Sequence, residues 1–513
     1  MQVHLGIDIG TSAVKAVLLA ERGEVVGEGS CALNFTVPSP GFAEQNPNDW
    51  WEGTRSAVNQ AMSSGVQSIE IAGIGVSGQM LGSVLMDKNG DADEHCIIWM
   101  DQRAAKQRDR VEKTIGLDRI LDRTANYPLV SLWAPKLLWL RENDPEAYSR
   151  IHQILFPKDY LKFRLTGEYD VDVTDAAGTM LFDTAKRTWD KELFHALDVD
   201  PAFVPDRTSE SIEVIGRVSK DAATFLGIPA GISVVAGGGD QMCGAVGLGV
   251  VREGAVSSTI GTSGCVFTQS ASCVIDREPR ALLSYCHSVP DTWCLYGCTL
   301  AAGGAYQWLR NSIFKNENVA WDTGGQNIYT FMDSCATRSR PGCEGLVFLP
   351  YLSGERTPHP DPNARGVFFG LSQRHGVGDI CRSVMEGVVF SLRDTVEIFR
   401  EHGIGVERVY AAGGGAASPL WLQMQADIFG ATVSVNSVQE APAVGAALLA
   451  AVGSGMYANV EEASRDVSKV IRECEPDPRN VELYNDYYQT YTGLYPTLRS
   501  LYASQAGLVD KWH

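Results

Sequence analysis

Two copies of one short polar turn, one in each half of the chain, have residue types and spacing that could do chemistry. Residues 9–12 read IGTS, and residues 260–263 repeat the same four letters. A Gly-Thr-Ser turn between strands offers backbone N–H groups and two hydroxyls, which suit phosphate oxygens. One copy alone is more simply an ordinary hairpin turn. Because hydrophobic runs flank both copies, we interpret the pair as two parts of one phosphate site.

Two acidic residues accompany these turns. Asp8 interrupts an apolar run just before the first turn, where a carboxylate is costly unless it has a partner. Magnesium beside phosphates would be such a partner, and a hydrogen bond to a loop is an equally simple one. Asp240 follows three glycines after the apolar run ISVVA, where α/β proteins collect ligands. Phosphoryl transfer to an alcohol needs a base for the hydroxyl proton, and Asp240 fits that role, although Asp is common in glycine-rich turns.

Three other patterns with chemical meaning are incomplete. Residues 73–78 match GxGxxG, but the sequence that follows indicates loop, strand and turn, not the helix that would hold a pyrophosphate. The chain contains no GxxxxGK followed by Ser or Thr, which excludes a P-loop. Cys286 and His287 have no second ligand pair at zinc-like spacing. The phosphate hypothesis therefore depends on the two IGTS turns.

The elements that must position these residues fall into two series. In the first, residues 3–33 predict strand, turn, strand, turn and strand, a helix begins near Asn48, and residues 69–78 form a buried strand. In the second, residues 255–267 again predict strand, turn and strand, and residues 408–435 predict strand, glycine turn, helix and strand.

The end of the chain adds helices to the second series. Residues 441–451 predict a Gly- and Ala-rich helix packed closely on a sheet, and the tail from Glu473 predicts a terminal helix. Two α/β series, each opened by an IGTS turn, indicate a pseudo-repeated architecture with a cleft between its halves. We place the boundary near residues 244–250, which gives lobes at 1–245 and 246–513.

Length and composition agree with a two-lobed globular protein. A chain of 513 residues is too long for one hydrophobic core. The 43 Lys and Arg against 62 Asp and Glu give a formal charge of −19, which argues against nucleic acid or an anionic membrane as a partner. The twelve cysteines contain no CxxC pair and indicate reduced thiols. With no signal-peptide pattern at the start, the prediction is a cytoplasmic protein.

The motifs as a set resemble the FGGY family of carbohydrate kinases, which belongs to the actin-like ATPase superfamily. They occur in the family's order as DIGTSAVKAVLL, GIGVSGQMLG, WMDQRA, APKLLWL, AGGGDQ, IGTSG, GVFFGL and AAGGGAASPLWLQ. The resemblance implies an α/β fold of two ribonuclease H-like lobes with the active site in the cleft between them. It also implies transfer of the γ-phosphate of ATP to a terminal hydroxyl of a sugar, for which a ketopentose such as D-xylulose is expected.

The resemblance also assigns roles to residues of this chain. Asp240 matches the catalytic base and Asp8 the acid that organises magnesium, so both are expected at the metal. The residues that match phosphate and nucleotide motifs are Gly10, Thr11, Ser12, Lys15, Gly261, Thr262, Ser263, Gly303, Gly304, Gly414, Gly415 and Ser418. The residues that fall where the sugar is held are Gln79, Met80, Leu81, Asp240 and Gln241. The implied cofactors are ATP and Mg²⁺ and the implied partner is a small-molecule sugar; a homodimer is left open.

The chain departs from the family pattern on the sugar side. Family members that act on ketopentoses commonly read GQMHG where residues 78–82 read GQMLG. Leu81 therefore replaces a histidine whose imidazole could hydrogen-bond a sugar hydroxyl. A buried hydroxyl without its partner costs about 1–3 kcal/mol. Gln241 stands where Asn is common, and Trp99-Met100-Asp101 where WND is common. These changes leave two alternatives open: another acceptor, such as a ribulose, erythritol or a deoxy sugar, or a nucleotide-dependent sensor or actin-like module without catalysis.

Overall fold

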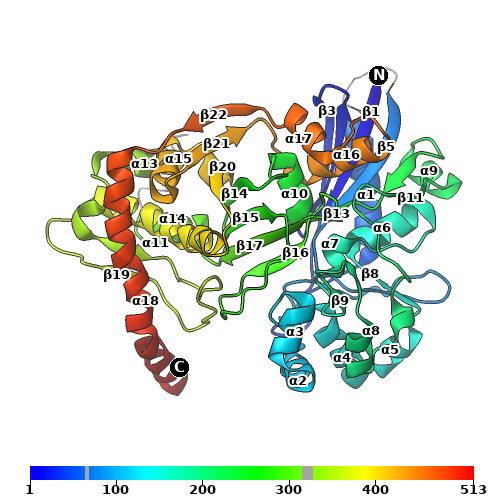
Figure 1. The fold of residues 1–513 in the computed structure, drawn as a ribbon, viewed down its shortest axis with the longest axis horizontal. Coiled ribbons are helices and arrows are strands. Elements are labelled where there is room, and N and C mark those ends of the chain that lie inside the picture. The colour runs from blue at the N-terminus through cyan, green and yellow to red at the C-terminus, as the bar shows by residue number, and fades with distance from the viewer. Residues whose placement is uncertain (64–68, 315–326, 513) are drawn as a thin grey trace.

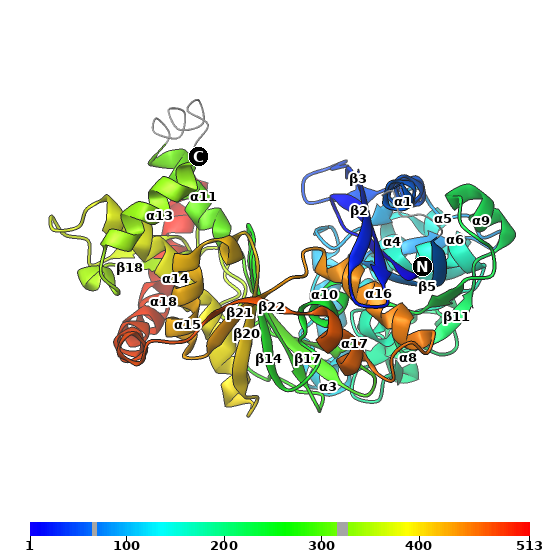
Figure 2. The ribbon, with the colours of Figure 1, turned by 90° about the horizontal axis from the view of Figure 1, so that it is seen from above.

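The computed structural model describes residues 1–63, 69–314 and 327–512, which form two lobes lying side by side (Figure 1). Within these residues, each lobe is built on a seven-stranded mixed sheet. Figure 2 shows the same two lobes from above, with helices on the faces of both sheets. The two α/β series predicted from the sequence are confirmed.

The N-terminal sheet has the order β11-β12-β5-β1-β2-β3, with β13 also beside β5. Its strands are β1 (Gln2–Ile9), β2 (Ala13–Ala20), β3 (Val25–Ala32), β5 (Glu70–Gly78), β11 (Val214–Arg217), β12 (Ser233–Val235) and β13 (Gly238–Gly239). Strands β1 and β2 are antiparallel across the first IGTS turn, while β5 runs parallel to β1. The GxGxxG match lies within β5, so it opens no helix.

The helices of the N-terminal lobe cover this sheet and extend below it in Figure 1. They are α1 (Pro47–Met62), α2 (Ala105–Ile115), α3 (Leu117–Thr124), α4 (Trp133–Asn143), α5 (Pro145–Arg150), α6 (Pro157–Thr166), α7 (Val173–Ala176), α8 (Lys191–Leu197), α9 (Lys220–Leu226) and α10 (Asp240–Leu248). Short two-stranded ribbons complete the lobe: β4 (Glu44–Gln45) with β7 (Cys96–Ile97), β6 (Val84–Met86) with β8 (Gln153–Leu155), and β9 (Phe182–Asp183) with β10 (Thr188–Trp189).

The C-terminal sheet has the order β16-β17-β15-β14-β20-β21-β22. Its strands are β14 (Gly254–Ile260), β15 (Gly264–Ser270), β16 (Leu283–Cys286), β17 (Trp293–Thr299), β20 (Val406–Gly413), β21 (Thr432–Asn436) and β22 (Val470–Cys474). The other elements of this half of the sequence are α11 (Gly303–Ser312), α13 (Ile328–Arg338), β18 (Val347–Leu349), β19 (Val367–Phe369), α14 (Val377–Glu401), α15 (Pro419–Phe429), α16 (Ala441–Gly453), α17 (Val460–Val467) and α18 (Pro478–Trp512), of which α16 and α17 lie with the N-terminal lobe (Figure 1).

The tail prediction is wrong in one detail. Glu473 belongs to β22, and the terminal helix α18 begins only at Pro478. Residues 470–474 pair antiparallel with β21, so sheet edge hydrogen bonds override the helical tendency there. Among the described residues, no helix is long and apolar enough to cross a membrane.

Helix α16 packs on the N-terminal lobe, although in sequence it lies between β21 and β22 of the C-terminal sheet. It packs on β1 and β5 of the N-terminal sheet and against α10. A Cβ on Gly6 would lie 1.9 Å from the carbonyl oxygen of Ala443, and a Cβ on Gly75 would lie 1.9 Å from that of Ala446. Glycine at these two strand positions therefore lets the helix approach the sheet closely, as the sequence predicted.

Candidate active site

Strand register brings the two predicted acidic residues to the same end of the N-terminal sheet. Asp8 on β1 is opposite Ser77 on β5, and Ser77 is in turn opposite Gly238 on β13. Asp240 is the first residue of α10, directly after β13. The end of three adjacent strands and the start of one helix thus hold both carboxylates.

Both carboxylates are buried in ways that change their acidity. The Ser77 hydroxyl donates to Asp8 Oδ1 at 2.9 Å, yet burial raises the pKa of Asp8 to about 6. Burial, followed by the charge of Asp8, raises the pKa of Asp240 to about 7. Two buried carboxylates that repel each other are a suitable place for a cation.

The first IGTS turn is held through the side chain of Thr11 and through backbone groups of the turn. The indole Nε1 of Trp99 donates to Thr11 Oγ1 at 2.9 Å, and that hydroxyl donates to Gln79 Oε1 at 3.3 Å. The backbone closes the turn with a bond from Gly10 N to Ala13 O at 3.0 Å. The side chain of Ser12 is exposed. The first turn is therefore tied to the predicted sugar loop.

Lys15 lies on β2, directly opposite Asp8 on β1. Its ammonium group forms an ion pair with Glu440 at 2.6 Å, just before α16. The two side chains are 40% and 33% exposed, so the pair is solvated enough to open. A phosphate contact for Lys15 stays a prediction.

The predicted sugar residues lie around the base. Met80 lies over Gly239, where an added Cβ would be 2.8 Å from Met80 Cγ. Leu81 has φ = 68°, a left-handed conformation that is costly for a leucine and is typical of functional loops. Its carbonyl accepts a bond from Lys136 Nζ at 2.7 Å, and its side chain packs against Gly178.

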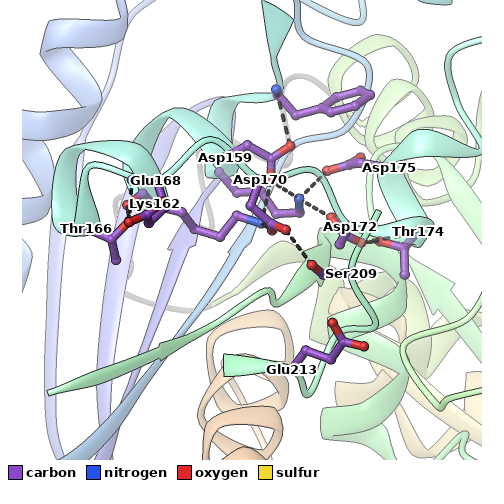
Figure 3. Close-up of polar contacts among 12 residues, drawn as sticks. Asp159, Lys162, Thr166, Glu168, Asp170, Asp172, Thr174, Asp175, Ser209 and Glu213 are labelled. Carbon is purple, nitrogen blue, oxygen red and sulfur yellow. Dashed lines mark hydrogen bonds and ion pairs between the residues drawn. The ribbon is translucent and has the colours of Figure 1, made fainter. Parts of the chain in front are cut away.

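A buried group of charged side chains, which includes Asp159, Lys162 and Asp172, lies in the N-terminal lobe (Figure 3). This base-support cluster consists of Lys158, Asp159, Lys162, Asp170, Asp172 and Asp175. Lys158 contacts Asp159, Asp172 and Asp175, so an ammonium group already occupies the centre of the three carboxylates that could otherwise hold a metal.

Thr174 connects the base-support cluster to the backbone just before Asp240, the predicted base. Its hydroxyl donates to Asp172, and the same oxygen accepts a bond from Gly239 N at 2.9 Å. Gly239 immediately precedes Asp240, so the cluster fixes the backbone at the position of the base. Buried ion pairs of this kind specify a geometry more than they add stability.

A cavity of about 580 Å³ in the C-terminal lobe collects the predicted nucleotide residues. Six of them line it: Gly261, Thr262, Gly303, Gly414, Gly415 and Ser418. Tyr306 and Trp421 also line it and supply aromatic surface that suits a nucleotide base. Asp333 accepts hydrogen bonds from Ser418 Oγ at 2.7 Å and from the Tyr306 hydroxyl at 3.1 Å.

The second IGTS turn is held by backbone groups at the start of α11. Gly303 N donates to Gly261 O at 2.7 Å, and Gly304 N donates to Thr262 O at 2.9 Å. Ser263 closes the turn, because its carbonyl accepts a bond from Gly261 N at 3.0 Å. Gly304 and Ser263 thus shape the turn, beside the residues that line the cavity.

Sequence reasoning missed several residues of this site. Thr174 and Asp333 act through hydrogen bonds to residues far away in sequence, and Glu440 pairs with Lys15 across 425 positions. No local pattern marks them. The same holds for Trp99, which the sequence marks only as part of a changed motif and whose contact with Thr11 depends on the fold.

The comparisons with known proteins agree with this geometry. The model of the N-terminal domain of the FGGY family of carbohydrate kinases matches residues 3–247, and that of the C-terminal domain matches residues 256–454. The chain belongs to the FGGY family of carbohydrate kinases, and its fold is the two-domain fold of that family. It is an enzyme of the carbohydrate kinase class, and ATP is the phosphate donor that this family implies.

Individual relatives match nearly the full chain. The xylulose kinases of Staphylococcus epidermidis and of Escherichia coli are each 36% identical to this chain over 98% of its length. The matched regions cover 98% and 100% of those two proteins, respectively. The crystal structure of xylulose kinase from Rhodospirillum rubrum superposes with a TM-score of 0.91 at 29% identity, covering 98% of this chain and 100% of that one.

Proposed function

We propose that this protein transfers the γ-phosphate of ATP to a terminal hydroxyl of D-xylulose, giving D-xylulose 5-phosphate. Full-length similarity to xylulose kinases supports the choice of acceptor. The single observation that carries the chemistry is the meeting of Asp8, Asp240 and the first phosphate turn at one end of the N-terminal sheet.

In this proposal Asp240 accepts the proton of the attacking sugar hydroxyl. The hydrogen bond from Gly239 N to Thr174 fixes the backbone beside that carboxylate, so its oxygen keeps one direction. The N–H groups of the two IGTS turns hold phosphoryl oxygens, one turn from each lobe. The pocket around Tyr306 and Trp421 holds the nucleotide.

Asp8 and Asp240 would hold Mg²⁺, which would neutralise charge on the phosphates of ATP. The fit is physical: burial raises the pKa of both carboxylates, the charge of Asp8 raises the pKa of Asp240 further, and the ammonium group of Lys15 pairs with Glu440. A homodimer and a cytoplasmic location stay predictions, for which size-exclusion chromatography and cell fractionation are the measurements.

A second acceptor is favoured by one observation. Leu81 occupies the substrate loop with no group that can hydrogen-bond a sugar hydroxyl, and it is held in a left-handed conformation against Gly178. D-Ribulose, L-ribulose, erythritol or a deoxy sugar could therefore exceed D-xylulose in kcat/KM. The expected loss for D-xylulose from one missing hydrogen bond is about one to two decades.

A coupled ADP-release assay across these sugars and polyols tests the acceptor. We expect D-xylulose to give the highest kcat/KM; a tenfold preference for another sugar would move the assignment to that sugar. Asp240→Asn tests the base and should lower kcat by at least about three decades while ATP binding, measured by calorimetry, is retained. The matched control is Asp221→Asn on exposed α9, which should leave both unchanged. An unchanged kcat in Asp240→Asn would remove Asp240 as the base.

A further inference from the structure

Two cysteines face each other in the C-terminal sheet beside the base. Cys265 on β15 is directly opposite Cys298 on β17, and both thiols are free and partly exposed. Cys265 Sγ lies 3.8 Å from Oε1 of Gln241, the residue after Asp240. A Cβ added to Gly264 or Gly297, the glycines next to them in sequence, would point toward α14. The two cysteines therefore lie on the opposite face of the sheet, which packs against the N-terminal lobe.

The backbone shows which kind of cross-strand pair this is. Cys298 N donates to Thr357 Oγ1 at 3.2 Å, and Cys298 O accepts a bond from Thr357 N at 3.1 Å. The N–H and C=O of one strand residue point to the same edge, so those of Cys298 point away from β15. Cys265 and Cys298 are thus a non-hydrogen-bonded pair, in which Cα atoms are about 4.5 Å apart. A disulfide spans about 4.4–6.8 Å between Cα atoms, so the pair can close without moving the strands.

The two thiols also differ in acidity. A hydrogen bond from Cys265 to the Cys298 sulfur, with help from the Arg356 guanidinium, lowers the pKa of Cys298 to about 7. The same hydrogen bond and burial raise the pKa of Cys265 well above its usual range. Cys298 is therefore the sulfur that carries the negative charge and attacks first.

We propose that Cys265 and Cys298 form a dithiol modification site on the wall between the lobes, which reacts with small disulfides such as oxidised glutathione to give a cross-strand disulfide. Cys298 thiolate attacks one sulfur of the small disulfide, breaks its S–S bond and releases one thiolate. Cys265 then loses its proton and attacks Cys298 Sγ, which releases the second thiolate. Two protein thiols are oxidised and one small disulfide is reduced to two thiols.

The first intermediate has a consequence for the kinase. A mixed disulfide on Cys298 places a tripeptide adduct beside Gln241, where the lobes meet. The adduct blocks that space, whereas the final cross-strand disulfide adds no atoms to it. Cys265 thus clears the adduct and limits inhibition to the lifetime of the intermediate.

The test is reaction of the full-length protein with oxidised glutathione, followed by intact mass and peptide mapping. In the wild type we expect loss of two hydrogen atoms and a peptide linking Cys265 to Cys298. In Cys265→Ser the glutathione adduct should persist on Cys298, and kinase activity with the best acceptor of the panel should fall at least tenfold and return with dithiothreitol. Cys298→Ser should form neither product at this site.

Controls separate this site from general thiol oxidation. Cys286 and Cys294 lie in the neighbouring strands β16 and β17 but are fully buried, so they should stay reduced under the same conditions. Thermal unfolding of both serine variants checks that they fold. No linked peptide in the wild type, or an equal adduct on Cys298 in the wild type and Cys265→Ser, would overturn the proposal. The mass readout does not use a sugar, so it stands even if D-xylulose is not the acceptor.

Discussion

The two IGTS turns share four letters and a strand-turn-strand fold, but they are held in place differently. In the first turn, the Thr11 hydroxyl is bonded to Trp99 and to Gln79. In the second turn, Thr262 is bonded through its backbone carbonyl to the amides at the start of α11. One turn is bonded to the side chains of Trp99 and Gln79, and the other to a helix that borders the cavity of the C-terminal lobe.

This difference shows that a repeated motif need not be held in place by the same kind of contact. Gln79 of the predicted sugar loop accepts a hydrogen bond from the Thr11 hydroxyl. A displacement of that loop should therefore affect the first turn. The second turn is instead held by backbone hydrogen bonds from the start of α11, which we call its clamp. It should therefore respond to substitutions in α11 and little to substitutions in the predicted sugar loop. Each prediction below tests one side of that comparison.

The largest effect is expected at the clamp of the second turn. In Gly303→Ala, the new Cβ would lie 2.5 Å from Gly261 O, a backbone atom that must move. Displacing a phosphate-binding turn by an ångström can cost about 100-fold. We expect kcat/KM for ATP to fall by about that factor, with KM for the sugar changed less than threefold.

The control for this change is Gly493→Ala in α18, where nothing lies within 4 Å of the added Cβ. It should leave both kinetic constants unchanged. If Gly303→Ala instead raised KM for the sugar as much as it lowered kcat/KM for ATP, the two turns would not be separable.

A comparable or smaller effect is expected from the hydroxyl of the first turn. Thr11→Val leaves the indole of Trp99 and the amide of Gln79 without their shared partner, which costs about 1–3 kcal/mol, or about 5- to 150-fold. We expect this loss in kcat/KM for the sugar. Thr262→Val is the matched variant, and it should change the same constant less than threefold. Equal losses would show that both hydroxyls act directly on phosphate.

The supports of the second turn also give a pH-dependent stability. Glu355 accepts bonds from Thr299 Oγ1 at 2.6 Å and from Leu300 N at 3.1 Å, just before α11. Burial raises the pKa of Glu355 to about 7, so between about pH 4.5 and 7 the folded chain keeps a proton that the unfolded chain releases. The free energy of unfolding therefore falls as pH rises through this window.

Glu355→Gln removes that titration. Its stability relative to the wild type should rise by about 2–3 kcal/mol between pH 4.5 and 7.5, measured by urea unfolding at a series of pH values. Parallel stability curves for the two proteins would show that Glu355 does not titrate in this range.

Sequence patterns predicted the strands around each turn because alternating burial and turn chemistry are local. They also singled out Asp8, Asp240 and six of the residues that line the cavity of the C-terminal lobe, since these lie within short motifs; the roles of these residues stay predictions. What holds the two turns could not be predicted, because Trp99, Gln79 and α11 reach them through the folded arrangement. A four-residue motif does not indicate which residues far away in sequence contact it. The strand β22 was missed for the same reason: its partner β21 lies more than 30 residues away.

The smallest effect is expected at the ion pair of Lys15 and Glu440. The pair is partly exposed, so breaking it should cost at most about 1 kcal/mol of stability. Glu440→Gln frees the ammonium group beside Asp8. If Lys15 contributes a cation to the first turn, the variant should lower KM for ATP up to about threefold, and Lys15→Met should raise it.

The two variants together sharpen the comparison, because the second turn has no lysine at the equivalent position, which is occupied by Val266. A charge effect on ATP should therefore appear only through the first turn. Measurements at low and high salt separate this effect from stability, since a solvated charge contact weakens as salt rises whereas packing does not. If Lys15→Met leaves KM for ATP unchanged at low salt, the first turn binds phosphate through its backbone alone, and the two turns are more alike than their supports suggest.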